Sequence, residues 1–245
     1  MKKHGFTLVE VLLSITIVGI VAALVFPTIS KTYQRAQTYP KLQKTISMIE
    51  QANEAILREA GTKDLHIAIP NIPDYADALR RNISKSRLFN RPNAQALPWN
   101  PPIAAFDGHR EGQLNRPSQV IYLPTGVVII MPNSGNFINN DFEEFGNGDF
   151  IGFYTQIIVD LNGPITGPNK YGRDLFYTTV DRNGSVIPDG SWTFAWAYNR
   201  HPEDAANADT YWKNNGDYKC HTKGDVPHGW GCAGSVIENK GVIYY

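Results

Sequence analysis

Residues 6–26 are the stretch that most constrains what this chain can fold into. Their sequence, FTLVEVLLSITIVGIVAALVF, is apolar almost throughout and has Glu10 as its only ionisable side chain. Because a helix rises about 1.5 Å per residue, a run of this length covers roughly 30 Å, the thickness of the hydrocarbon core of a bilayer. The stretch therefore predicts a membrane-spanning helix that carries one acid and ends near Pro27.

A cleavable signal peptide is the alternative for an apolar run at the start of a chain. Its apolar core would measure about 7 to 15 residues and would precede a small-x-small cleavage site. The run at 6–26 is longer than that, and the one small-x-small candidate after it is the tripeptide at 28–30. We therefore expect the helix to be retained.

The residues around Gly5 carry a resemblance to a known family. A short basic leader, MKKHG, is followed by FTLVE and the long apolar run. Together these resemble the processing site of type IV prepilins and type II secretion pseudopilins. The resemblance implies that prepilin peptidase cuts between Gly5 and Phe6 and methylates the new amine of Phe6. It also implies assembly with other pilin or pseudopilin subunits into a filament.

Glu10 follows Phe6 by one helical turn. A carboxylate in a membrane helix costs up to roughly 3 kcal/mol near the bilayer centre and less near an end, so a retained one usually has a function. In a filament of staggered helices, the Phe6 amine of one subunit can meet Glu10 of a neighbour and neutralise both charges. The alternative is an interfacial glutamate that reaches back to the lipid headgroups.

Charge does not determine the membrane orientation. Lysines 2 and 3 precede the span, but four basic residues at 31, 35, 41 and 44 follow it, so the positive-inside count favours the reverse topology. The resemblance instead implies a cytoplasmic leader, a single pass through the inner membrane and a periplasmic head. The whole chain has 23 basic and 23 acidic residues, which gives no bulk charge for binding nucleic acid.

Two cysteines, Cys220 and Cys232, lie close together near the C-terminus. In the oxidising periplasm that the resemblance implies, this pair suits a single disulfide. Zinc bound by both cysteines with His221 and His228 is the alternative, but the spacing fits no common zinc finger.

The sequence after Pro27 is amphipathic to about residue 61. Apolar residues recur there at spacings of three and four, as expected of a helix packed on a domain, at Tyr33, Ala36, Leu42, Ile46, Ile49, Ala52, Ile56, Leu57 and Ala60. We expect one helix over 6–60, its first part in the membrane and 27–61 in the head. Pro27 should bend or melt the helix, and Pro40 should interrupt it again.

The head, residues 62–245, should be rich in strands and turns, because most of the 16 prolines and 21 glycines lie in it. Strands are predicted over 120–123, 127–131, 150–160, 175–180 and 185–187, with hairpin turns at 124–126 and 181–184. A short helix is expected at 74–88, a loop at 98–102, and a last strand or extended tail at 235–245. The predicted fold class is α+β: a long N-terminal helix on an antiparallel sheet, which is also the fold that the resemblance implies.

The sequence DLNG at 160–163 begins like a calcium loop. Oxygen ligands at alternating positions before a glycine suit a hard cation, and the candidates are Asp160, Asn162 and Asp174. No glutamate closes the loop at its twelfth position, so it is not an EF-hand. The alternative is a hydrogen-bonded turn in which Asp160 and Asn162 cap backbone amides.

Motifs of catalysis are lacking in this sequence: it contains no G-x-S-x-G, H-E-x-x-H, Walker or G-x-G-x-x-G pattern. Alternating aromatic residues at 192–198 favour core packing, with a glycan or partner platform as the alternative. The sequence therefore predicts a non-enzymatic, pilin-like structural subunit of a secretion pseudopilus or type IV pilus. The head exceeds that of a typical major pseudopilin, which favours a minor subunit. A membrane-anchored adhesin or binding module that uses the pilin export route is the alternative, and an anchored hydrolase is the third choice.

Overall fold

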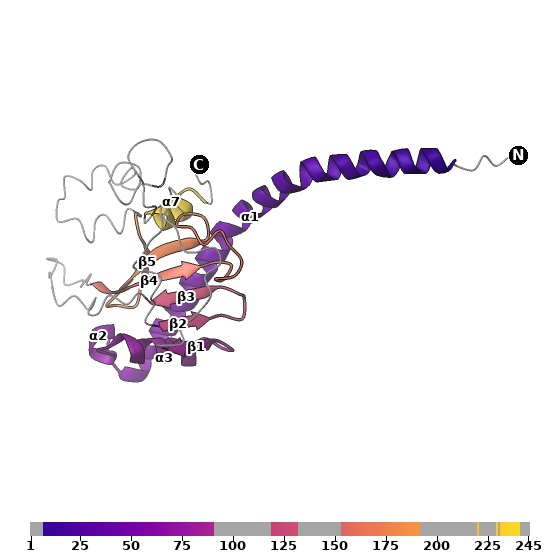
Figure 1. The fold of residues 1–245 in the computed structure, drawn as a ribbon. Coiled ribbons are helices and arrows are strands. Elements are labelled where there is room, and N and C mark those ends of the chain that lie inside the picture. The colour runs from indigo at the N-terminus through magenta and orange to yellow at the C-terminus, as the bar shows by residue number, and fades with distance from the viewer. Residues whose placement is uncertain are drawn as a thin grey trace, which may run out of the picture. The chain divides into compact units, whose positions relative to one another are not determined.

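The structure is a computed structural model that describes residues 7–90, 119–131, 153–191, 220, 229 and 231–240 (Figure 1). The chain divides into two compact units, Met1–Gln37 and Thr38–Tyr245, and the first helix contributes residues to both. The helices in the described residues are α1 (Leu8–Ala60), α2 (Leu65–Ala68), α3 (Ile72–Asn82) and α7 (Cys232–Glu238). The strands are β1 (Arg87–Asn90), β2 (Gln119–Tyr122), β3 (Val128–Met131), β4 (Phe153–Asp160), β5 (Leu175–Asp181) and β6 (Val186–Pro188).

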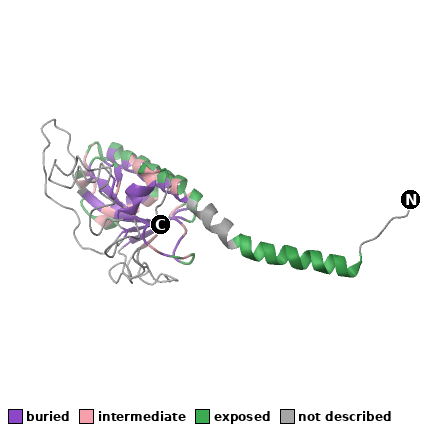
Figure 2. Ribbon diagram, turned by 90° about the horizontal axis from the view of Figure 1, so that it is seen from above, coloured by how far each residue is buried: buried purple, intermediate pink, exposed green. Residues whose placement is uncertain are grey.

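The first unit contains the apolar start of α1. Residues Leu8–Phe26 form a segment long and apolar enough to cross a membrane, and every residue in it is exposed (Figure 2). Large aliphatic side chains on all sides of a helix are stable only in an apolar surrounding. The predicted apolar helix is therefore confirmed.

Both prolines lie inside a continuous α1. The helix runs from Leu8 to Ala60, so the expected interruption at Pro40 and the expected melting at Pro27 are wrong. Pro40 is exposed, with its ring away from the core, and Leu42, Ile46 and Ile49 pack the next two turns against the domain. This packing offsets the hydrogen bond that a proline cannot donate. A bend at Pro27 stays a prediction.

The strands form one antiparallel sheet in the order β1-β2-β3-β4-β5-β6. Two of its connections are the tight turns expected from the sequence, at 124–126 between β2 and β3 and at 182–185 between β5 and β6. The predicted strands at 120–123, 127–131, 175–180 and 185–187 are thus confirmed within a residue or two. The predicted strand at 150–160 corresponds to β4, and residues 150–152 lie outside the described residues.

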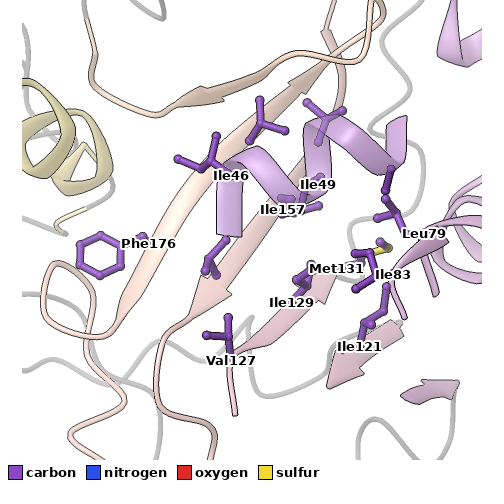
Figure 3. Close-up of a cluster of buried hydrophobic side chains, with 14 of the residues drawn as sticks. Ile46, Ile49, Leu79, Ile83, Ile121, Val127, Ile129, Met131, Ile157 and Phe176 are labelled. Atoms are coloured by element: carbon purple, nitrogen blue, oxygen red, sulfur yellow. The ribbon is translucent and has the colours of Figure 1, made fainter. Parts of the chain in front are cut away.

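The core lies between one face of the sheet and the part of α1 that follows residue 38. Ile46 and Ile49 of α1 belong to the same buried cluster as Ile129 and Ile157 of the sheet (Figure 3). The buried residues of α1 match the predicted stripe at Leu42, Ile46, Ile49, Ala52, Ile56 and Leu57, whereas Ala36 and Ala60 are exposed. The prediction of a sheet laid on the head half of the helix is confirmed.

Two polar side chains of α1 reach the β5–β6 hairpin. The Asn53 side-chain amide donates to the Gly184 carbonyl at 2.8 Å, and Glu50 accepts the Val186 amide at 3.1 Å. Gly184 has φ +92°, and an added Cβ would lie 3.1 Å from Cβ of Asn53. Hydrogen bonds from side chains of the helix to the backbone of the hairpin therefore hold the two elements together. They do so at a turn that requires glycine.

The region between α1 and the sheet differs in part from the prediction. The expected helix at 74–88 corresponds to α3, which ends at Asn82, and Leu88 belongs to the edge strand β1. Four side chains on one face of α3, Tyr75, Ala76, Ala78 and Leu79, are buried, and this face ends before the strand begins. The predicted loop at 98–102 lies outside the described residues.

The C-terminal segment is a helix where a strand or extended tail was expected. Helix α7 covers Cys232–Glu238, and residues 241–245 lie outside the described residues. The first five residues of α7, Cys232 to Val236, are all buried, so this part of the helix is enclosed rather than buried on one face only. The backbone approach is close, since a Cβ added at Gly234 would lie 2.2 Å from the Ser191 amide nitrogen. Small residues thus let α7 pack directly on the main chain that follows β6.

Candidate processing and assembly site

Helix α1 begins with a hydrogen-bonded cap made by Thr7 and Glu10. The Thr7 amide donates to Oε2 of Glu10 at 2.8 Å, and the Thr7 hydroxyl donates to the same oxygen at 2.9 Å. In return, the Glu10 amide donates to the Thr7 hydroxyl at 3.3 Å. This reciprocal pair is a capping box, which satisfies amide groups that a helix start leaves without partners.

The cap determines the geometry of the one acid in the apolar run. Glu10 lies in the first turn of α1, where a carboxylate also interacts favourably with the helix dipole. The two bonds from Thr7 use one carboxylate oxygen, Oε2, and both leave from a residue that precedes the helix. Bonds within the same chain therefore hold Glu10 at the first turn of the helix, and no contact with another subunit is needed for this.

Thr7 is a functional residue that our reading of the sequence missed. Its signal was present as Thr-x-x-Glu immediately before an apolar run, the sequence signature of a capping box. The site prediction included Glu10 and passed over its partner three residues earlier. Gly5 and Phe6, the predicted cleavage and methylation positions, lie outside the described residues and stay predictions.

Polar side chains further along the apolar run bond within the helix. The Ser14 hydroxyl donates to the Glu10 carbonyl at 2.7 Å, and the Thr16 hydroxyl donates to the Leu12 carbonyl at 2.8 Å. Each hydroxyl is thus satisfied by the carbonyl four residues earlier. The segment can enter an apolar phase without an orphaned hydroxyl.

The predicted pairing of the two cysteines is confirmed. Cys220 and Cys232 form a disulfide with their Cα atoms 4.9 Å apart, and both are fully buried. Cys232 is the first residue of α7, so the bond attaches the start of this helix to a preceding segment. Both thiols are consumed, which removes the thiolates that the zinc alternative required. The histidines of that alternative, His221 and His228, lie outside the described residues.

The three calcium candidates come together in the connection between β4 and β5. Asp160 ends β4 and accepts the amides of Asn162 and Gly163 on Oδ1, at 3.1 and 2.9 Å. Asp174 stands just before β5 and accepts the amides of Asn169 and Lys170, at 2.8 and 2.7 Å. The capping of amides by Asp160, which the alternative reading predicted, is thus present. The Asn162 side-chain oxygen makes no such bond within the described residues.

Burial changes the acidity of the carboxyl groups in the sheet domain. Burial raises the pKa of Asp160 to about 7, and the neighbouring Asp174 carboxylate adds to the rise. Burial also raises the pKa of Asp174, against opposing bonds from the Lys170 and Asn169 amides and the Asn162 side chain. The Asp174 carboxylate therefore lies near enough to Asp160 to disfavour a second charge there.

Asp189 is a further buried carboxyl group, placed just after β6. Burial raises the pKa of Asp189 to about 7, although both of its oxygens have partners. The Thr179 hydroxyl donates to Oδ1 at 2.8 Å, and the Gln156 side-chain amide donates to Oδ2 at 3.1 Å. Asp189 thus differs from Asp160, which uses only one of its two oxygens.

Comparisons with known proteins match the N-terminal segment. Residues 1–26 match the family model described as the prokaryotic N-terminal methylation motif. No curated protein and no solved structure matches the chain. The match covers the leader, the capping box of Thr7 and Glu10, and the whole of the exposed apolar segment.

A capped apolar helix that continues into an α+β domain is consistent with the pilin fold. The methylation motif at residues 1–26 supports a subunit of the pilin or pseudopilin type. The motif therefore points to a structural subunit.

Proposed function

We propose that this protein is a minor pilin-like subunit that is cut after Gly5, methylated at Phe6 and assembled through α1 into a filament. The filament is a type II secretion pseudopilus or a type IV pilus. Before assembly, the subunit is anchored in the inner membrane by one span, with its leader in the cytoplasm and its head in the periplasm.

One observation carries the proposal. The methylation motif coincides with a helix segment, Leu8–Phe26, that is exposed along its whole length and contains a single acid. Such a segment needs an apolar surrounding, which lipid supplies before assembly and other α1 helices supply in a filament. The motif accounts for the leader and the acid, and the exposed surface accounts for the need to associate.

Glu10 supplies the specificity of the association. The Thr7 bonds fix its carboxylate in the first turn and occupy Oε2, which leaves Oε1 to accept a further donor. The methylated amine of Phe6 on a neighbouring subunit is a cation of matching charge. Pairing the carboxylate with the amine lowers the free-energy cost of burying the two charges in an apolar filament core.

The N-terminus of the mature protein is the first measurement. Full-length chain is expressed together with a prepilin peptidase, and mass spectrometry is performed on the membrane fraction. We expect a chain that begins with N-methylated Phe6. A chain that begins at Met1, or one that lacks the apolar segment, would contradict the proposal.

Replacement of Glu10 by alanine tests the assembly step. E10A should remain membrane-inserted and cleaved, but its recovery in sheared filaments should fall at least tenfold, roughly the effect of leaving one partner of a buried ion pair alone. T16A is the matched control, because its hydroxyl bonds only to the Leu12 carbonyl of the same helix. Unchanged incorporation of E10A would remove Glu10 from its proposed role.

A further inference from the structure

The turn between β5 and β6 carries an exposed Asn-x-Ser triplet. Its residues are Asn183, Gly184 and Ser185, within the sequence DRNGS at 181–185. Asn183 and Ser185 are exposed, whereas Gly184 between them is buried against α1. An Asn-x-Ser triplet without a central proline is the acceptor pattern for N-linked glycosylation on surface loops of exported proteins. The hairpin turn accounts for the Asn-Gly pair, but it does not require the serine.

The fold uses the backbone of this turn and one side-chain oxygen. The Asp181 amide donates to the Ser185 carbonyl, and the Gly184 amide donates to the Asp181 carbonyl, both at 2.9 Å. The Ser185 amide donates to Oδ1 of Asn183 at 2.8 Å. This last bond forms an Asx-turn, which holds the carboxamide in place at the surface. It also polarises the carboxamide and makes the N–H groups on its nitrogen more acidic.

Two polar groups of the triplet take no part in these bonds. In the part of the chain that the structure describes, neither Nδ2 of Asn183 nor Oγ of Ser185 makes a hydrogen bond. The nitrogen is the atom to which a glycan is attached, and the hydroxyl is the group that serine and threonine share in the acceptor pattern. The fold therefore leaves free the two groups that an acceptor needs.

A second triplet of this pattern, Asn82-Ile83-Ser84, differs in its surroundings. Asn82 is the last residue of α3, and its Nδ2 donates to the Ala78 carbonyl at 3.0 Å. Attachment of a glycan to Asn82 would disturb this bond at the end of the helix. The sequence pattern is the same at both places, so the local structure favours Asn183 as the acceptor.

We propose that Asn183 is N-glycosylated on the exported side of the membrane. Nδ2 forms a bond to the anomeric carbon of an oligosaccharide carried on a lipid pyrophosphate. The bond from that carbon to the pyrophosphate oxygen breaks, the lipid pyrophosphate leaves with the electron pair, and a base of the transferase takes one proton from Nδ2. The inference rests on the proposed export of the head. It places the β5–β6 turn at the outer surface of the filament, because a glycan needs solvent around it.

Peptide mapping by mass spectrometry is the primary test, performed on the full-length chain purified from the membranes of the cells that produce it. We expect a glycan on the peptide that contains Asn183, in chains that begin with methylated Phe6. A glycan on Asn183 of a chain that begins at Met1 would support this inference and contradict the proposed processing. Asn183 without a glycan, or merely deamidated, in chains that begin with methylated Phe6 would overturn this inference and leave the proposed function intact.

Substitutions in the triplet separate an acceptor from a plain turn. S185A removes the hydroxyl but keeps the backbone amide that bonds to Asn183, so the hairpin should fold and the glycan should be lost. S185T restores a hydroxyl and should keep the glycan. Thermal unfolding of both variants checks that their folds are equally stable. A glycan that persists in S185A would contradict the proposal.

N82Q is the matched control. It removes the second triplet and leaves the β5–β6 turn unchanged, so the glycan of the unsubstituted chain should be retained in full. Loss of the glycan in N82Q would assign the modification to Asn82 and overturn the proposal. Equal modification of Asn82 and Asn183 would contradict the selection of Asn183 by its free amide nitrogen.

Discussion

The two ends of α1 have opposite surfaces although they belong to one continuous helix. From Leu8 to Phe26 every residue is exposed, and most of them are large and aliphatic. From residue 38 to 60 the apolar side chains are buried on one face and the polar ones are exposed, apart from a few with tertiary partners. The second part is thus matched to a sheet in its own chain, whereas the first part requires an apolar environment that its own unit, within the described residues, does not supply.

Polar side chains of the two parts differ in the same way. Ser14 and Thr16 bond to carbonyls of their own helix, four residues earlier. Asn53 and Glu50 bond instead to the β5–β6 hairpin, more than 130 residues later in the sequence. The first part is self-sufficient in hydrogen bonds and lacks only apolar contacts. The second part contributes both kinds of interaction to its domain.

The largest expected effect comes from paired truncations of isoleucine in the two parts. I49A should lower the free energy of unfolding of the domain by about 2 to 5 kcal/mol, because Ile49 is fully buried against the sheet and leaves a cavity. I17A should leave that free energy unchanged, because Ile17 is 53% exposed and makes no part of the core. Urea denaturation of the full chain in detergent, followed by circular dichroism, measures both. Equal losses would break the comparison.

Paired removal of polar groups gives the next effect. N53A should cost about 2 to 4 kcal/mol, because the Gly184 carbonyl and the Tyr75 hydroxyl, which donates to Asn53 at 2.9 Å, lose a buried partner. S14A should cost less than about 0.5 kcal/mol, since its hydroxyl bonds only within the helix. The same denaturation experiment applies. A cost for S14A as large as that for N53A would show that the apolar segment also depends on tertiary hydrogen bonds.

A change of pH should affect the sheet domain through its buried carboxyl groups. The folded state raises the pKa of Asp189 from 3.8 to about 7, so between these values it binds a proton that the unfolded state has released. Stability from this group is therefore complete below pH 3.8 and is lost as pH rises toward 7, by up to about 1.4 kcal/mol per pH unit. D189N should flatten the pH profile of unfolding in this window by that amount. An unchanged profile would show that Asp189 does not carry a raised pKa.

The sequence predicted those elements of the fold for which a local pattern of residues agrees with the tertiary packing. The three-and-four spacing from Leu42 to Ile56 predicted the buried face of α1, and β-branched runs on both sides of tight turns predicted β2, β3, β5 and β6. Pro40 misled the prediction because local propensity disfavours a proline in a helix, whereas packing of the turns beyond it outweighs that cost. The helix α7 was missed although Val236 and Asn239 lie three residues apart, a spacing that suits a helix better than a strand, and its buried residues begin earlier, at Cys232.

The candidate sites were predictable where their residues lie close together in the sequence, and not where the contacts join residues far apart. Asp160, Asn162 and Asp174 could be grouped in advance because all three border one short connection. The disulfide could be proposed because the chain contains only two cysteines. The bonds of Asn53 could not be foreseen, since Gly184 lies 131 residues away and an asparagine in a helix has no preferred partner. Thr7 was predictable from its spacing to Glu10. The prediction included Glu10 because of its charge in an apolar run, and it did not include the residue that caps the same turn.

The position of Thr7 bears on how much of the chain changes when the leader is removed. Both members of the cap lie beyond the expected scission, and the first helical bond among the described residues, from the Val11 amide to the Thr7 carbonyl, also involves only later residues. Cleavage at Gly5 would therefore shorten the precursor without unwinding a single turn. The new terminus would then precede the Thr7–Glu10 cap by one residue in the sequence, with its amine available to an adjoining subunit.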